Sequence, residues 1–96
     1  MDEKIQLIHP AGKKLPRINK SKYDLLSTTI RKVLKNGPLT HKGLHEAVMK
    51  YLASKKIKFE GSVEWYMEGS KLDMEAHNII ERITDKSMLK FQLKKK

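Results

Sequence analysis

Two histidines are the residues of this chain whose spacing comes closest to a reactive site. His41 and His45 lie four residues apart in a segment with helical periodicity, so both rings would project from one helix face. Imidazoles at this spacing can share a metal ion such as zinc. The helical metalloprotease motif needs a glutamate directly after the first histidine, whereas Glu46 follows the second. The pattern therefore favours a surface histidine pair, and we predict no metal site.

Other catalytic patterns are missing from the sequence. Serine, threonine and aspartate occur where helix caps and turns need them, without a nucleophile–base pair, a glycine-rich phosphate loop or a paired-carboxylate motif. The chain has no cysteine, which excludes disulfides and thiolate metal ligands. We therefore predict a protein that is not an enzyme and has no cofactor. The apolar run near the N-terminus is too short for a signal peptide or a membrane span, so we expect a cytoplasmic protein without a membrane partner.

The charged residues are distributed unevenly along the chain. Residues 1–58 carry 14 Lys and Arg against 4 Asp and Glu, residues 59–85 carry 2 against 7, and residues 86–96 carry 5 Lys and no acid, within a net charge of +10. Clustered cations bind nucleic acid by displacing counterions from its phosphates, whereas scattered lysines merely keep a domain in solution. The nucleic-acid interpretation selects nine candidate residues: Lys13, Lys14, Arg17, Lys20, Lys22, Lys42, Lys71, Lys86 and Lys90.

The length of 96 residues allows one modest hydrophobic core. Residues 1–20 are predicted to be an N-terminal strand over Ile5–Ile8 followed by a basic connector or a second, irregular strand. Residues 21–93 form the main domain, and 94–96 are a basic tail.

Capping residues and apolar stripes predict three helices in the main domain. The first begins at Ser21, whose side chain forms a capping box with Asp24. The second begins after the cap Thr40, and the third begins at Ser62. Asn78 suits the left-handed residue that ends the third helix.

Two β-type runs follow, and they predict a hairpin. The runs are 79–83 and 88–93, and the second alternates apolar and polar residues. Residues 84–87 form the polar turn between them.

This order of elements resembles a winged helix-turn-helix. The resemblance is specific at Gly37-Pro38-Leu39-Thr40, the junction between the first two helices, and at residues 72–82, which look like a recognition helix running into a wing strand. It implies an α+β fold with a three-helix core, a C-terminal β-hairpin wing and a short N-terminal strand. It also implies that Leu39 forms a one-residue strand against the wing.

The whole chain further resembles a small uncharacterised bacterial family of unknown function. The matching segments are Ile5-Gln6-Leu7-Ile8-His9-Pro10 with Gly12-Lys13, Gly61-Ser62 with Trp65-Tyr66, and Lys71-Leu72-Asp73-Met74-Glu75-Ala76. This resemblance supports the fold and implies no activity.

The third helix conflicts with ordinary DNA reading. Its apolar stripe is predicted to face the core, with Trp65 buried rather than stacked on bases, and comprises Trp65, Gly69, Leu72 and Ala76. The outward stripe is then mostly acidic and comprises Glu64, Glu68, Lys71, Glu75 and Asn78. Carboxylates facing phosphates cost several kcal/mol, so standard recognition-helix docking is disfavoured.

Two functional hypotheses remain open. The preferred one is a winged-helix, nucleic-acid-associated protein of the DNA-binding regulatory kind, whose contacts with duplex DNA or another nucleic acid come from basic residues outside the acidic third helix. The alternative is a protein–protein interaction module. In that case Glu64, Glu68 and Glu75 would form the face that binds a basic protein or a second copy of the chain.

Overall fold

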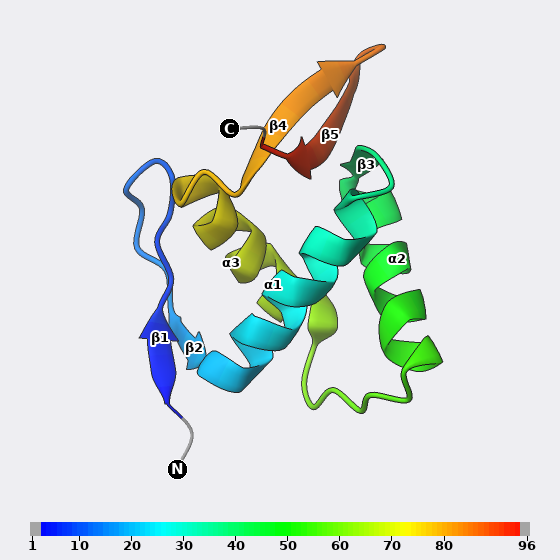
Figure 1. Ribbon diagram of the computed structural model, residues 1–96. Coiled ribbons are helices and arrows are strands. Elements are labelled where there is room, and N and C mark those ends of the chain that lie inside the picture. The colour runs from blue at the N-terminus through cyan, green and yellow to red at the C-terminus, as the bar shows by residue number, and fades with distance from the viewer. Residues whose placement is uncertain (1–2, 95–96) are drawn as a thin grey trace.

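The computed structural model describes residues 3–94, so of the predicted basic tail only Lys94 is included. The elements in chain order are β1 (Lys4–Gln6), β2 (Arg17–Asn19), α1 (Lys20–Leu34), β3 (Leu39–Thr40), α2 (His41–Ser54), α3 (Val63–Ala76), β4 (Ile80–Asp85) and β5 (Met88–Leu93) (Figure 1). One antiparallel sheet has the strand order β3-β5-β4, and β1 pairs with β2 in a second. The predicted α+β class is confirmed, with its three helices, C-terminal hairpin and short N-terminal strand.

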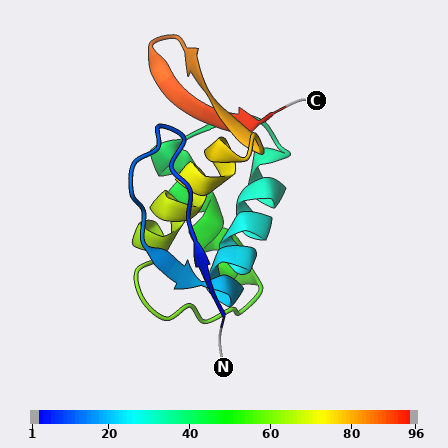
Figure 2. The same cartoon turned by 90° about the vertical axis from the view of Figure 1, so that its left-hand side faces the viewer.

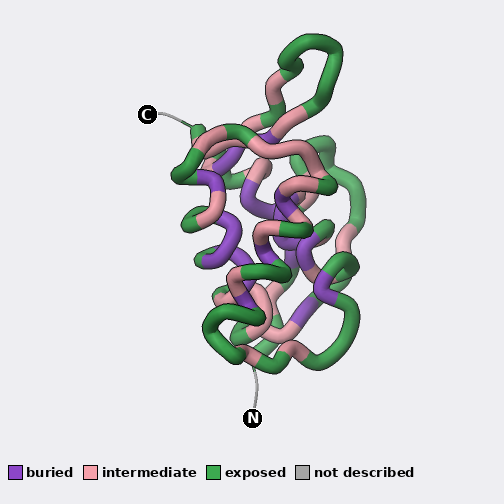
Figure 3. The backbone as a smooth tube through the Cα atoms, turned by 90° about the vertical axis from the view of Figure 1, so that its right-hand side faces the viewer, coloured by how far each residue is buried: buried purple, intermediate pink, exposed green. Residues whose placement is uncertain are grey.

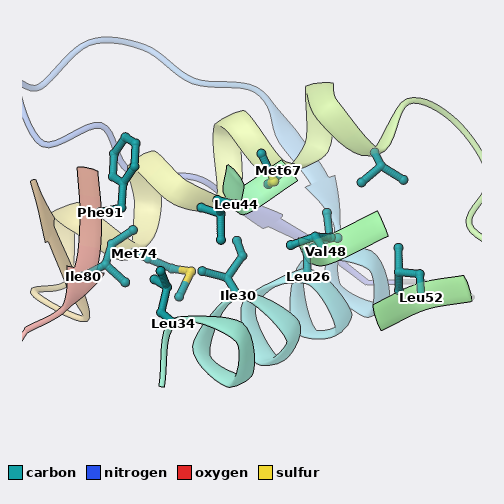
Figure 4. Packing of buried hydrophobic residues seen from close by; sticks show 11 residues of the cluster. Leu26, Ile30, Leu34, Leu44, Val48, Leu52, Met67, Met74, Ile80 and Phe91 are labelled. Carbon is teal, nitrogen blue, oxygen red and sulfur yellow. The ribbon is translucent and has the colours of Figure 1, made fainter. Parts of the chain in front are cut away.

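The core lies where the apolar stripes of the three helices meet the base of the hairpin (Figure 4). Burial of these side chains is the main term that stabilises the fold. The labelled core residues are Leu26, Ile30 and Leu34 of α1, Leu44, Val48 and Leu52 of α2, Met67 and Met74 of α3, and Ile80 and Phe91 of the hairpin.

The junction between α1 and α2 matches the prediction. The Thr40 side chain accepts a hydrogen bond from the Gly43 N–H at 3.0 Å and thus caps α2. Leu39 pairs with Phe91 of β5, which confirms the short strand against the hairpin. This strand ties the helical body to the hairpin and fixes where the hairpin leaves it.

The hairpin turn is shorter than predicted. The β4–β5 ladder runs to the pair Asp85↔Met88, so the loop is the two residues Lys86 and Ser87 rather than 84–87. Both loop residues have positive φ, 50° and 68°, as a type I′ turn requires. Its twist matches that of the flanking strands, which explains why the tight turn is formed. The end of the hairpin projects from the body, and the tube is coloured as exposed there (Figure 3).

The start of α1 differs from the prediction. Asn19, and not Ser21, is the N-cap, because its side-chain oxygen accepts a hydrogen bond from the Lys22 N–H at 3.2 Å. Asn19 ends β2 in an extended conformation, which turns its side chain toward the first helical turn. Asp24 makes no capping box and instead pairs with Lys20 at 3.1 Å on the exposed surface.

The caps of α3 are confirmed, but its orientation is not as predicted. Ser62 caps the helix through the Trp65 N–H, and Asn78 has the expected positive φ of 61°. The buried apolar residues are Val63, Met67 and Met74, whereas Trp65 is 53 % exposed. The helix has two apolar sides, and the predicted inward stripe faces the N-terminal segment instead of the core.

Candidate nucleic-acid interface

Residues 3–19, which comprise β1, β2 and the loop between them, form an arm that lies along α3 (Figure 2). The closest approach is at Gly69, where a Cβ would lie 2.7 Å from the end of the Leu7 side chain, Cδ1. Leu7 is only 3 % exposed, and Ile18 of β2 is equally buried. The arm therefore packs through its own apolar residues on the side of α3 that carries Gly69. Part of the outer face of α3 is covered as a result.

Asp73 is the polar anchor of the arm. Its buried carboxylate accepts a hydrogen bond from the Ile8 N–H at 2.8 Å and another from the Tyr23 O–H at 2.7 Å. A third neighbour is His77, whose Nδ1 lies 3.3 Å from the same carboxylate. Burial, and then the bond to Asp73, raises the pKa of the Tyr23 hydroxyl, so Tyr23 keeps its proton. One carboxylate thus joins the arm, α1 and α3.

The arm presents three of the predicted basic residues to solvent. Lys13, Lys14 and Arg17 are exposed, and they form no ion pair with any other residue in the range 3–94. The loop before them is held by a turn in which the Gly12 N–H bonds to the His9 carbonyl at 2.9 Å, with Gly12 at a φ of 77°. These cations therefore stand on a segment that is fixed at the turn and against α3.

The hairpin carries the second group of cations. Lys86 is exposed in the turn, while Lys90 pairs with Asp85 at 3.0 Å. Lys94 donates a hydrogen bond to the Asn78 side chain at 3.1 Å. Of the predicted cations of the hairpin, Lys86 is therefore the one without a carboxylate partner among the described residues.

The structure does not bring the remaining predicted cations to this surface. Lys20 pairs with Asp24, and Lys22 is half-buried with its ammonium 4.7 Å from the Tyr66 ring centre. Lys42 is exposed on α2, which lies on the other side of the body from the arm (Figure 1). These residues are scattered rather than convergent.

Lys71 is the clearest correction among the predicted site residues. It is 2 % exposed, so it cannot contact nucleic acid from the outward stripe where the sequence pattern placed it. Its ammonium lies 2.6 Å from His41 Nδ1, 3.9 Å from the Glu68 carboxylate and 4.2 Å from the Phe91 ring centre. Burial lowers the pKa of Lys71, and the carboxylates of Glu68 and Glu75 oppose that shift. The residue is a structural link between α2, α3 and the hairpin.

The three carboxylates of the alternative hypothesis have different surroundings. Glu75 accepts two contacts from Arg82 Nε, at 2.9 and 3.0 Å, and its side chain is 10 % exposed. Glu64 and Glu68 are exposed on either side of Trp65. The Trp65 ring packs edge-to-face on Tyr66, with ring centres 4.9 Å apart, and leaves half its surface open. Sequence periodicity did not predict the exposure of Trp65, because an apolar stripe has the same spacing whether it faces the core or the arm.

The histidine pair does not gather further ligands. His41 faces Lys71 and Glu68, and no group of three His, Cys, Asp or Glu side chains suited to a metal occurs between residues 3 and 94. Within the same range, no helix is both long enough and apolar enough to cross a membrane.

Comparison with known proteins identifies the family. The model of a family of unknown function, DUF6958, matches residues 4–91, and the chain belongs to that family. No curated protein and no solved structure matches the chain.

Proposed function

We propose that this member of the DUF6958 family is a winged-helix protein that binds nucleic acid through cations of its arm and hairpin, with α3 set behind the arm. The observation that carries the proposal is the anchoring of the arm. Leu7 against Gly69 and Ile8 on Asp73 hold the arm over the outer side of α3. A winged helix-turn-helix turns that side of its third helix toward the duplex.

Charge supports this use of the arm. Lys13, Lys14 and Arg17 are exposed and carry no carboxylate partner among residues 3–94. Phosphate contacts by such cations position a protein without reading base sequence. Lys86 at the hairpin turn would add a contact with the neighbouring backbone, as the wing of this architecture does. The expected activity is therefore sequence-independent and sensitive to salt.

Salt titration of duplex DNA binding tests the proposal. Each phosphate contact contributes about −0.9 to the slope of log K against log salt concentration. Reversal of the three arm cations (Lys13→Glu, Lys14→Glu, Arg17→Glu) is expected to make the slope shallower by about 2.7, which is three such contacts.

The matched control reverses three exposed cations away from the arm, with the same change in net charge: Lys35→Glu, Lys50→Glu and Lys55→Glu. It should leave most of the slope in place, because long-range charge alone is screened beyond about 10 Å at 0.1 M salt. Equal losses in the two triple variants would show that only net charge matters and would overturn the arm proposal. Absence of binding by the wild type at low salt would overturn the function.

A further inference from the structure

An acidic, partly apolar groove runs along α3 from Glu64 to Leu72 beside the arm. A pocket of about 160 Å³ lies between the two, and its apolar lining includes Leu7, Leu15, Trp65 and Leu72. A cavity of about 150 Å³ holds a benzene molecule, so the pocket has room for one aliphatic side chain. Glu64 and Glu68, together with the exposed Trp65, border a second hollow that continues from it. The pocket and the second hollow together are called the acidic groove.

The hairpin end has the opposite chemistry. Its turn and the start of β5, residues 86–90, are called the hairpin tip. Met88 and Leu89 are 53 % and 47 % exposed there, although both are large and apolar. Lys86 beside them is exposed without a carboxylate partner among the described residues, whereas Lys90 is paired with Asp85 at 3.0 Å. Adjacent exposed apolar residues at the end of a projecting hairpin are suited to insertion into a partner.

The two surfaces cannot meet within one molecule. The groove follows α3 from Glu64 to Leu72 beside the arm, and the hairpin projects from the body beyond the end of that helix (Figure 1). Since their apolar and charged features are complementary, the partner that satisfies both is another molecule of the same chain. We propose that the hairpin tip of one copy docks in the acidic groove of a second copy, with Met88 or Leu89 entering the pocket.

Such a contact is head-to-tail rather than two-fold symmetric. Each end molecule keeps one free tip or one free groove, so association continues into open chains or closed rings. A hairpin tip covers a small area, and interfaces below about 1,200 Å² are typically weak and transient. The expected assembly is therefore concentration-dependent, and salt weakens it because Lys86 faces the carboxylates of the groove.

Sedimentation velocity without nucleic acid tests the proposal. Wild-type protein at millimolar concentration should form species larger than dimers. A tip variant (Met88→Ser with Leu89→Ser) and a groove variant (Trp65→Ser with Glu64→Gln) should each remain monomeric. An equimolar mixture of the two should stop at a 1:1 dimer, because only one tip and one groove remain intact. Met49→Ser is the matched control, since Met49 is 45 % exposed on α2, outside both surfaces, and should assemble like the wild type.

Circular dichroism checks that each variant is folded. Glu64→Lys is a second groove variant that keeps Trp65, and it should also reduce self-association. A monomeric wild type at millimolar concentration would overturn the inference, as would undiminished assembly of the tip variant. Loss of DNA binding in the tip variant, with the wild type monomeric, would instead make the tip a nucleic-acid contact. The tip variant keeps every cation, so failure of self-association leaves the salt-dependence test of the proposed function intact.

Discussion

The anchoring role of Asp73 leads to a quantitative prediction for Asp73→Ala. The substitution removes the acceptor of two hydrogen bonds, one from the Ile8 N–H at 2.8 Å and one from the Tyr23 O–H at 2.7 Å. A hydrogen bond to a charged group contributes about 1.5–3 kcal/mol. Ile8 is 49 % exposed, so water replaces part of its bond, and we take the lower figure for each. The free energy of unfolding should fall by about 3 kcal/mol.

That loss should leave the domain folded, because a chain of 96 residues is stable by about 5–15 kcal/mol. Denaturant unfolding gives the global value, and hydrogen exchange gives the local one. The Ile8 amide and the β1–β2 amides should exchange faster in Asp73→Ala, since the arm loses its polar anchor.

Two comparisons make the test specific. Asp24→Ala also removes a carboxylate, but from an exposed pair with Lys20, so its free energy of unfolding should stay close to that of the wild type. Tyr23→Phe removes one of the two bonds to Asp73 and leaves Ile8 bonded, so arm exchange should not change. If Asp73→Ala costs no more than Asp24→Ala, or if arm exchange is unaltered, the anchoring argument is wrong.

Tyr23 adds a pH dependence to the same experiment. Burial and the bond to Asp73 raise its pKa in the folded protein above the ordinary value of about 10. The stabilisation from the retained proton is therefore complete below about pH 10 and is lost as the pH rises further. The stability difference between wild type and Tyr23→Phe should shrink in alkaline solution.

Three further predictions follow from single contacts. A hydrogen bond from Lys32 lowers the pKa of Tyr51, so Lys32→Met should move the ultraviolet titration of Tyr51 back toward about pH 10; an unchanged titration curve would contradict the contact. Burial lowers the pKa of Lys71, which makes its charge a cost at neutral pH that disappears as the pH approaches 10.5. The stability of Lys71→Met relative to the wild type should therefore fall as the pH rises from 7 toward 10.5, and a relative stability that does not change with pH would refute this. Gly69→Ala places a methyl group 2.7 Å from Leu7 Cδ1, which is the end of a flexible side chain, so Leu7 should shift and its repacking should offset the gain of about 1 kcal/mol in helix propensity. We expect faster hydrogen exchange of the arm amides with little change in the global free energy of unfolding, and unchanged arm exchange would argue against close packing of the arm.

Local signals in the sequence predicted most of the fold. Thr40 and Ser62 cap helices because each side-chain hydroxyl accepts a hydrogen bond from the backbone N–H three residues later. Such a cap depends only on neighbouring residues of the sequence. Asn78 adopts a left-handed conformation for an equally local reason. The strand at Leu39 followed from the resemblance, and its partner Phe91 is fixed by the fold.

The candidate site depended on contacts that local patterns do not encode. Asp73 and Tyr23 are fifty residues apart in sequence, so the residues around either one do not predict the hydrogen bond between them. Lys71 is polar and was expected outside, yet His41 and Phe91 provide partners that make its burial tolerable. Trp65 was expected inside because helical periodicity identifies an apolar side without identifying what covers it.

Most of the acidic side chains in residues 59–85 contact other residues of the fold. From the sequence, the seven acidic residues of 59–85 predict that α3 and the following strand repel a phosphate backbone. Five of them contact other residues of the fold. Asp73 holds the arm, Glu75 is paired with Arg82, and Asp85 is paired with Lys90. Glu81 accepts a hydrogen bond from the Gln92 side chain at 2.6 Å, and Glu68 lies 3.9 Å from the Lys71 ammonium. On α3 itself only Glu64 and Glu68 remain as exposed carboxylates, and both lie toward the start of the helix. Repulsion of phosphate would then be confined to the acidic groove, while Lys13, Lys14 and Arg17 are not among the residues that line it. Because Lys86 serves both proposed contacts, nucleic acid at the hairpin and the groove of a second copy should compete for it.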